Sequence, residues 1–255
     1  MKIAIVTGAS SGIGREFVRQ IARKEHLDEI WVMARRENRL NELKNEITES
    51  IIRPIPLDLI KEESIKSIAA LLKEEKPDVR ILVNASGFGK FGTYKDLSLQ
   101  EINNMIDLNC KAAVNLTMIT LPHMNKNARI IEICSASAFQ PLPGLNIYAA
   151  TKAFLYHYSR ALRWELFPRR IKVTAVCPDW VKTEFCKVAA DTKNGHTVKH
   201  FPFAVEPKNV VACALFDSHL GLPVSTYSVA FIHRICAKFI PHEIIIAIWE
   251  ALRRI

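Results

Sequence analysis

The sequence predicts a single α/β domain in which helices cover both faces of a doubly wound parallel sheet. Short apolar runs rich in β-branched residues alternate along the 255 residues with longer segments that repeat apolar residues every three or four positions. The short runs are apolar throughout, which is typical of strands buried on both faces of a parallel sheet. This alternation indicates right-handed strand–helix–strand units, and no linker divides them.

The expected strands and helices follow one another in strict order. Strands are expected at Ile3–Val6, Ile30–Met33, Ile51–Pro56, Ile81–Asn84, Arg129–Cys134 and Ile171–Val176. Helices are expected between them at Ile13–Lys24, Arg36–Ile47, Glu62–Glu75, Leu99–Leu121 and Tyr148–Phe167.

The regular pattern ends near Pro178. The stretch Asp179–Pro207 is polar, and we expect it to form a loop over the crevice at the carboxyl ends of the strands, where ligands bind. Two helices, Val229–Phe239 and His242–Arg253, are expected to close the chain. Residues 1–255 are then one domain, with a ligand-binding and catalytic core over 1–185 and a substrate loop with C-terminal helices over 186–255.

Composition argues against several classes of function. The net charge is +9, but the basic residues are scattered without a run of five, which disfavours nucleic-acid binding. The six cysteines are widely spaced and form no CxxC pair, which indicates a reducing, cytoplasmic location. The sequence contains no run of about 18 apolar residues, so no membrane-spanning helix is predicted. His196 and His200 have a spacing found in some zinc sites, but without a third ligand we expect no metal.

A glycine-rich turn follows the first expected strand. It reads Thr7-Gly8-Ala9-Ser10-Ser11-Gly12-Ile13-Gly14 and leads directly into a helix. Glycines let the backbone turn sharply and approach a pyrophosphate, whose charge is met by the helix N-terminus. The position of the turn, between a strand and an amphipathic helix, therefore predicts a dinucleotide-binding site.

The residues after the second strand indicate which dinucleotide binds. In an NAD site an acidic residue near this place accepts hydrogen bonds from the adenosine ribose. Here Ala34 is followed by Arg35 and Arg36. Because a guanidinium makes bidentate bonds to a phosphate, we predict NADPH, with Ser10 and Ser11 as further donors.

A tyrosine and a lysine form the candidate catalytic pair. Tyr148 and Lys152 are spaced i and i+4 on an expected helix, which places the phenol and the ammonium on one face. A neighbouring ammonium favours phenolate and so moves the tyrosine pKa toward neutrality. Ser135 lies at the end of the fifth expected strand, where its hydroxyl can hold the carbonyl oxygen that Tyr148 protonates.

Taken together, these residues resemble the short-chain dehydrogenase/reductase family, from residue 2 to about residue 185. Besides the glycine turn and the catalytic set, four segments are similar to family motifs. They are Asp58-Leu59 (the pair beside the adenine ring), Asn84-Ala85-Ser86-Gly87 (NNAG), Asn109 (the helix asparagine) and Pro178-Asp179-Trp180-Val181-Lys182-Thr183 (PGxVxT). The resemblance implies a Rossmann-like fold and an NADP(H)-dependent oxidoreductase that interconverts a carbonyl and a secondary alcohol.

The resemblance also implies roles for single residues. Tyr148 would be the general acid in reduction, and Lys152 would bind the nicotinamide ribose and lower the tyrosine pKa. Ser135 would orient the substrate oxygen, and Asn109 would hold a water that returns the proton. The full expected cofactor-binding set is Gly8, Ser10, Ser11, Gly12, Ile13, Gly14, Arg35, Arg36, Asp58, Leu59, Asn84, Ala85, Gly87, Tyr148, Lys152, Pro178, Val181 and Thr183.

Two positions depart from the family pattern. Ala85 replaces the second asparagine of NNAG, which puts a hydrogen bond beneath the cofactor in doubt. Asp179 replaces the glycine after Pro178, at a place where the backbone usually passes close to the nicotinamide. Neither change removes a catalytic group. In the family, the helices that correspond to Leu99–Leu121 and Tyr148–Phe167 pair with a second subunit, so a homodimer is expected.

The C-terminal segment has three interpretations. Its apolar residues are interleaved with basic ones from Phe231 to Arg254. Such helices can lie on an anionic membrane, roof a lipophilic substrate pocket or simply pack on the domain. By analogy with short-chain reductases of lipids and steroids, we expect an apolar ketone as substrate. The intact catalytic set argues against a non-catalytic NADPH-binding regulatory or scaffold protein, and the short C-terminal region against a nucleotide-sugar epimerase or dehydratase.

Overall fold

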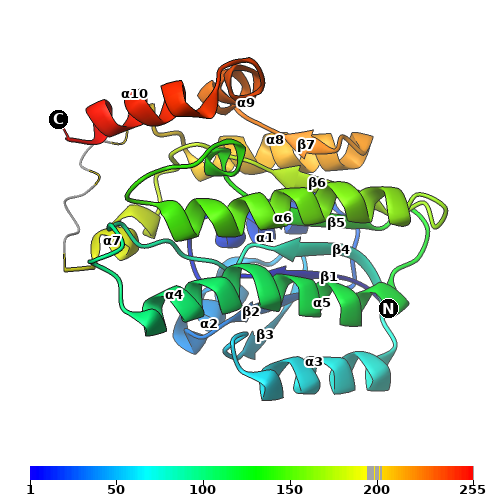
Figure 1. Ribbon diagram of the computed structural model, residues 1–255. Helices are drawn as coiled ribbons and strands as arrows, with labels where there is room; N and C mark the ends of the chain where they lie inside the picture. Colours follow the sequence, from blue (N-terminus) through cyan, green and yellow to red (C-terminus); the bar gives the residue numbers. More distant parts are fainter. Residues whose placement is uncertain (194–197, 199–200, 202, 255) are drawn as a thin grey trace.

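The computed structural model carries a seven-stranded sheet in the order β3-β2-β1-β4-β5-β6-β7 (Figure 1). It describes residues 1–193, 198, 201 and 203–254. Every neighbouring pair of strands in the sheet is parallel. The strands are β1 Lys2–Thr7, β2 Glu29–Ala34, β3 Ile51–Pro56, β4 Asp78–Asn84, β5 Arg129–Ile133, β6 Lys172–Val176 and β7 Val224–Ser225. The predicted doubly wound α/β fold is confirmed, because the order reverses beside β1 as the chain crosses from β3 to β4.

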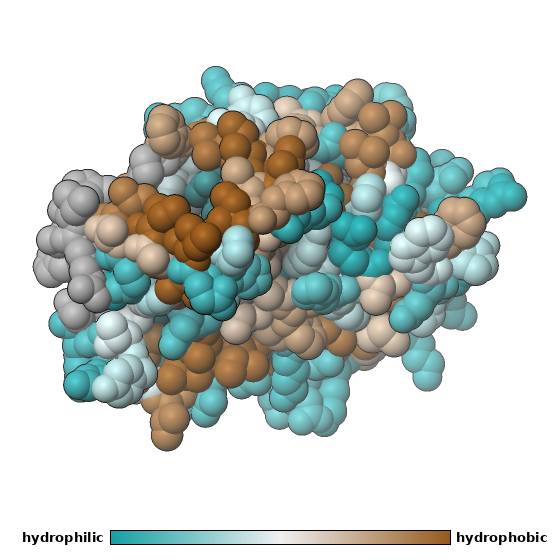
Figure 2. All heavy atoms as spheres, turned by 45° about the horizontal axis from the view of Figure 1, so that its top comes forward, coloured by the Kyte–Doolittle hydropathy of each residue, from teal (hydrophilic) through white to brown (hydrophobic). Residues whose placement is uncertain are grey.

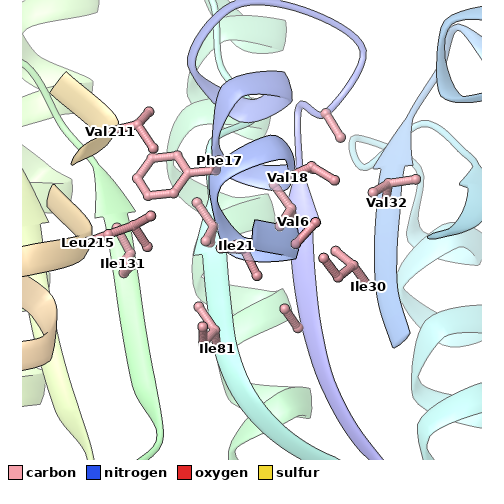
Figure 3. Close-up of a cluster of buried hydrophobic side chains, with 14 of the residues drawn as sticks. Val6, Phe17, Val18, Ile21, Ile30, Val32, Ile81, Ile131, Val211 and Leu215 are labelled. Atoms are coloured by element: carbon pink, nitrogen blue, oxygen red, sulfur yellow. The ribbon is translucent and has the colours of Figure 1, made fainter. Parts of the chain in front are cut away.

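Helices cover both faces of this sheet. The helices of the described chain are α1 Gly12–Lys24, α2 Glu37–Glu46, α3 Glu62–Glu75, α4 Leu99–Ile106, α5 Ala113–Thr120, α6 Asn146–Glu165, α7 Phe185–Ala190, α8 Pro207–Leu220, α9 Val229–Phe239 and α10 His242–Arg254, of which α1, α2 and α8 pack on one face of the sheet and α3, α5 and α6 on the other. One apolar cluster joins α1, α2 and α8 to one face, and Figure 3 shows Phe17 and Ile21 of α1 in it beside Val211 and Leu215 of α8. A second cluster joins α3, α5 and α6 to the other face. Burial of these two clusters supplies the main driving force for the fold.

The segment predicted as one helix over Leu99–Leu121 contains an extra element. A π-helical turn, η1 Asp107–Ala112, separates α4 from α5, and the backbone stays in the right-handed helical region across both junctions. The helix starts at Ser98, whose side chain forms a capping box with Glu101. A π turn inserts one residue into a helix and is frequent at functional sites.

The region after β6 is more ordered than the expected loop. Helix α7 lies inside the stretch predicted as a loop, so that expectation is wrong over Phe185–Ala190. Helix α8 was not predicted, although Pro207 at its first turn and Gly221 just past its end, with φ +74°, are the usual boundary residues. His196 and His200 lie outside the described residues.

The two C-terminal helices are confirmed as α9 and α10. They lie beyond α8 and β7 at the edge of the sheet, and α10 extends toward α7 (Figure 1). Among the described residues, no helix is long and apolar enough to cross a membrane.

Candidate active site

A cavity of about 440 Å³ lies at the carboxyl ends of the central strands. The residues that follow six of the strands line it. They are Gly8–Gly14 without Ala9 after β1, Arg35 and Arg36 after β2, Leu57–Leu59 after β3, Ala85–Phe88 after β4, Cys134 and Ser135 after β5, and Pro178–Val181 after β6. Residues from α6, α7, α9 and α10 complete the wall. This is the crevice in which doubly wound folds bind their ligands.

The glycine turn at the start of α1 is packed so closely that side chains are excluded. Gly8 has φ +65°, and a Cβ on it would lie 2.6 Å from the carbonyl oxygen of Ala85. A Cβ on Gly14 would lie 2.4 Å from the carbonyl oxygen of Gly8. Thr7 Oγ1 accepts hydrogen bonds from the backbone N–H groups of Ala85 and Ser86, each at 3.0 Å. The turn thus keeps the N-terminus of α1 open to the cavity, which fits a bound pyrophosphate.

A cationic group lies at the outer end of this turn. The Arg36 guanidinium donates to Ser10 Oγ from Nε and Nη2, at 3.2 and 3.1 Å, and from Nη1 to the Glu184 carboxylate at 2.8 Å. This contact holds the pKa of Glu184 below its usual range. Arg35 is exposed and also lines the cavity. Two guanidinium groups beside a serine hydroxyl match the chemistry of a phosphate on the adenosine ribose.

The pair expected beside the adenine has a polar and an apolar member. Asp58 and Leu59 both line the cavity just after β3. Asp58 Oδ1 accepts the backbone N–H of Ile60 at 3.2 Å, which orients the carboxylate, and Leu59 is buried. The two predicted residues are therefore placed side by side at the end of the crevice away from Tyr148.

Tyr148, Lys152 and Ser135 meet in the middle of the cavity. Tyr148 and Lys152 lie one turn apart on α6, with Lys152 Nζ 5.7 Å from the centre of the phenol ring. Lys152 is buried and donates to the backbone carbonyl of Ile133 at 2.7 Å. Ser135 caps a short 3₁₀ turn, η3 Ala136–Phe139, and its Oγ accepts the backbone N–H of Ser137 at 3.1 Å. The sequence spacing therefore identified three side chains that share one cavity.

Burial dominates the ionisation of this pair. It raises the pKa of Tyr148 above its usual value, while the nearby Ser135 hydroxyl lowers it by a smaller amount. Burial also lowers the pKa of Lys152. The sequence predicts that the Lys152 ammonium moves the pKa of Tyr148 toward neutrality. In the protein alone the opposite direction prevails, because desolvation of the phenolate outweighs an ammonium that is 5.7 Å from the ring and is bonded to a carbonyl.

Two of the predicted residues lie behind the cavity wall. Asn109, in η1, is fully buried; its Oδ1 accepts the N–H of Phe88 at 3.0 Å, and its Nδ2 donates to the Phe88 carbonyl and to Thr151 Oγ1. A Cβ on Gly87 would lie 2.9 Å from Asn109 Oδ1, so a larger residue there would have to displace the Asn109 amide. Asn109 thus fixes the loop that follows β4 against α6.

The other residue behind the wall is Asn84. Its Nδ2 donates to Glu132 Oε1 at 2.7 Å and to Thr117 Oγ1 at 2.9 Å. Glu132 is fully buried in β5, and burial raises its pKa to about 7. Sequence reasoning missed Glu132, since nothing in the strand Arg129–Ile133 marks one position as facing Asn84; only the β4–β5 register pairs the two.

The C-terminal helices form a roof over the cavity, which is one of the three interpretations that the sequence leaves open for them. Trp249 of α10 and His233 of α9 both line it. Trp249 Nε1 donates to the backbone carbonyl of Pro143 at 2.8 Å, which ties α10 to the loop before α6. His233 Nδ1 lies 3.9 Å from Asp179 Oδ2. The amphipathic pattern of these helices predicted a buried face, but only the tertiary structure shows that this face lies over Tyr148.

Comparison with known proteins agrees with this geometry. The family model described as short chain dehydrogenase matches residues 2–194. The chain belongs to the short-chain dehydrogenase family. The resemblance inferred from the motifs is confirmed, and as a member of this family the chain is an oxidoreductase that acts on CH–OH or C=O groups.

Individual relatives are moderately similar to this short-chain dehydrogenase. Sulfoacetaldehyde reductase 2 of Chromohalobacter salexigens is 34% identical over 73% of this chain and 75% of its own length. An NADP-dependent 3-hydroxy acid dehydrogenase of Escherichia coli is 33% identical over 88% of this chain and 91% of its own length. Among solved structures, a short-chain dehydrogenase from Sphingobium yanoikuyae in complex with NADPH superimposes with a TM-score of 0.79, at 26% identity over 93% of both chains.

Proposed function

We propose that this short-chain dehydrogenase uses NADPH to interconvert a ketone and a secondary alcohol, and that the ketone carries an apolar body. The observation that carries the proposal is the convergence of Tyr148, Ser135 and Lys152 with the glycine turn in one cavity. A phenol, a hydroxyl and an ammonium in that arrangement suit proton transfer to a carbonyl oxygen.

The residues of the cavity would hold the cofactor along its whole length. The glycine turn and the N-terminus of α1 would hold the pyrophosphate, Arg35, Arg36 and Ser10 the ribose phosphate, and Asp58 with Leu59 the adenine. When bound, NADPH supplies the hydride. Two relatives described above are named for NADP or contain NADPH, which supports the choice of the phosphorylated cofactor.

The side chains around the substrate oxygen divide the remaining work. Ser135 would hydrogen-bond to the carbonyl oxygen and so orient it, and Tyr148 would donate a proton to that oxygen as it gains negative charge. The raised pKa of Tyr148 keeps its phenol protonated at neutral pH, which is the form that an acid requires. Lys152 would bind the nicotinamide ribose. Asn109 would hold the loop after β4 against α6, the helix that carries Tyr148.

A screen of carbonyl compounds, followed through NADPH absorbance, tests the proposal. We expect turnover of ketones with a bulky apolar group. Binding of NADPH without turnover of any ketone, aldehyde or alcohol would instead favour the alternative, a non-catalytic regulatory or scaffold protein.

Since the six cysteines are free, we propose that the protein acts in the cytoplasm.

The roof of the cavity predicts selectivity for large ketones. Trp249 faces Leu142 and Leu145 in one apolar cluster of the substrate end. Each buried methylene is worth about 0.8 kcal/mol, so Trp249→Ala is expected to raise the ratio of KM for a large ketone to KM for a small one by about tenfold, with NADPH affinity unchanged. Steady-state kinetics with a short and a long ketone measure this ratio.

Leu252→Ala on the same helix is the matched control for Trp249→Ala. Leu252 is 59% exposed, and apolar side chains gather on the surface formed by the C-terminal helices (Figure 2). If that surface instead contacts membranes, Leu252→Ala will reduce sedimentation with anionic vesicles and leave KM alone. An unchanged KM ratio in Trp249→Ala would eliminate the roof interpretation.

We also propose a homodimer formed through α4, α5 and α6, which lie side by side (Figure 1). These helices expose large apolar side chains, among them Met118, Phe154 and Trp164, and Phe167 is exposed just beyond the end of α6. Light scattering at micromolar concentration is expected to give the mass of two chains. Phe154→Glu combined with Trp164→Glu should give one chain, whereas Phe216→Glu on α8 should not change the mass. A single-chain mass for the unmodified protein would refute the dimer.

A further inference from the structure

The loops that follow β5 and β6 are joined at the substrate end of the cavity. The backbone N–H of Ala136 donates to the carbonyl of Pro178 at 2.8 Å. This bond places η3, which begins beside Ser135, against Asp179, the residue that replaces the glycine of the family pattern. His233 of α9 closes the group from above, 3.9 Å from Asp179 Oδ2 and with its ring 6.3 Å from that of Phe139. Asp179 therefore lies close to the position proposed for the substrate oxygen.

The Asp179 carboxylate keeps one oxygen available. Oδ1 accepts the N–H of Trp180 at 2.9 Å. Within the part of the chain that the structure describes, Oδ2 has only the His233 contact, which at 3.9 Å is too long for a hydrogen bond. Burial lowers the pKa of His233, which favours a neutral imidazole there. A carboxylate oxygen with capacity to accept thus lines the cavity.

Two further residues that line the same cavity each carry a buried side-chain oxygen without a partner among the described residues. Gln140 and Ser137 are 92% and 93% buried, and among the described residues neither Gln140 Oε1 nor Ser137 Oγ has a hydrogen bond. A buried polar atom without a partner destabilises the folded state unless a ligand or water satisfies it. The carboxylate and the amide oxygen can only accept, and the hydroxyl can accept as well. The complementary group on a ligand is a hydrogen-bond donor.

We infer that Asp179, Gln140 and Ser137 form a subsite for a hydrogen-bond-donating group of the substrate, a hydroxyl or an ammonium close to the reacting carbonyl. This inference rests on the proposed function and specifies its substrate class: a ketone with an apolar body under Trp249 and a donor beside the carbonyl. A site built to bond a hydroxyl discriminates strongly against an analogue that lacks the donor, because its own acceptors are then left unpaired.

Four matched aryl ketones test the subsite, in which the carbon beside the carbonyl carries hydrogen, methoxy, hydroxyl or amino. Methoxy and hydroxyl differ in donor capacity, so kcat/KM for the hydroxy ketone is expected to exceed that for the methoxy ketone by about tenfold or more. Asp179→Gly and Gln140→Leu should each reduce this ratio to about one. Asp191→Asn is the control and should keep the ratio, since Asp191 is 91% exposed and outside the cavity lining.

Asp179→Asn separates the two donor groups. It removes the charge and keeps an acceptor oxygen, so if the charge contributes to binding it should weaken turnover of the amino ketone by about tenfold and that of the hydroxy ketone much less. If the site only accepts a hydrogen bond, turnover of the two ketones should change by the same factor. Equal turnover of hydroxy and methoxy ketones by the unmodified protein would overturn the inference and leave the proposed function intact.

If no ketone reacts, the proposed function fails, and a binding measurement still decides the subsite. In the presence of NADPH, the hydroxy and amino alcohols that correspond to these ketones should raise the thermal midpoint of the unmodified protein more than the methoxy alcohol does. The difference should vanish in Asp179→Gly. Equal midpoints for all the alcohols would then reject the subsite.

Discussion

Replacement of Tyr148 by phenylalanine is expected to lower kcat by about a hundredfold or more, with the Kd for NADPH nearly unchanged. The change removes one oxygen atom from the cavity and leaves the ring, which packs against Phe185 with their centres 5.2 Å apart. Only the proton donor is lost, so binding and chemistry should separate. Single-turnover measurements of NADPH oxidation, beside fluorescence titration of NADPH, give the two quantities.

Two further variants make that result specific. Tyr158→Phe makes the same change on the same helix but outside the cavity lining, and it should retain activity. Lys152→Ala should weaken both NADPH binding and turnover, because Lys152 is proposed to bind the nicotinamide ribose and lies beside the phenol. More than a few per cent of the original kcat in Tyr148→Phe would mean that another group supplies the proton.

The second large effect concerns the choice of cofactor. We expect NADPH to bind at least about tenfold more tightly than NADH, a difference of about 1.4 kcal/mol. Arg35→Asp should erase or reverse this preference, because it places a carboxylate where the ribose phosphate would lie. Arg36→Ala should weaken NADPH binding and spare NADH, since its guanidinium already bonds to Ser10 and Glu184 on that side of the turn. Calorimetric titration of each variant with both dinucleotides provides the values.

Arg39→Asp controls for the general effect of charge. Arg39 is on α2, one turn beyond the pair, and it lies outside the cavity lining with a contact of 3.4 Å to Glu42. It changes the net charge by the same amount as Arg35→Asp and should leave the preference in place. Equal affinity of the unmodified protein for NADPH and NADH would contradict the assignment of Arg35 and Arg36 to the ribose phosphate.

The sheet was predictable because each strand from β1 to β6 is at least five residues long and rich in apolar residues. β7 is only Val224–Ser225, which is too short for such a pattern, and its place depends on pairing with β6. α8 was missed for another reason: it packs on α1 and on the sheet at once, so its apolar residues do not follow a single stripe. α7 is six residues long and is stabilised mainly by contacts with the cavity wall.

The residues of the candidate site can also be divided into those that the sequence predicts and those that it does not. The glycine turn, the arginine pair and the Tyr148–Lys152 spacing could be predicted, since each is a short run whose chemistry depends on neighbours in sequence. For the C-terminal helices the sequence left three alternatives open, a roof over the pocket among them, because a segment so far beyond Tyr148 could dock in several ways, and His233 was not singled out. Glu132 depended on strand register, and the free acceptors of Gln140 and Ser137 could only be recognised once their surroundings were known.

The π turn at Asp107–Ala112 imposes a constraint on chain length. Successive residues of an α-helix are rotated by about 100° around its axis. Deletion of one residue from this turn would allow a regular helix, but it would rotate α4 by that angle relative to α5. Asn109 could then no longer reach Phe88 and Thr151 while Met105 stays buried. The fold therefore fixes the number of residues between the cap at Ser98 and the end of α5 at Thr120. Surface loops tolerate insertions and deletions, but this segment should not.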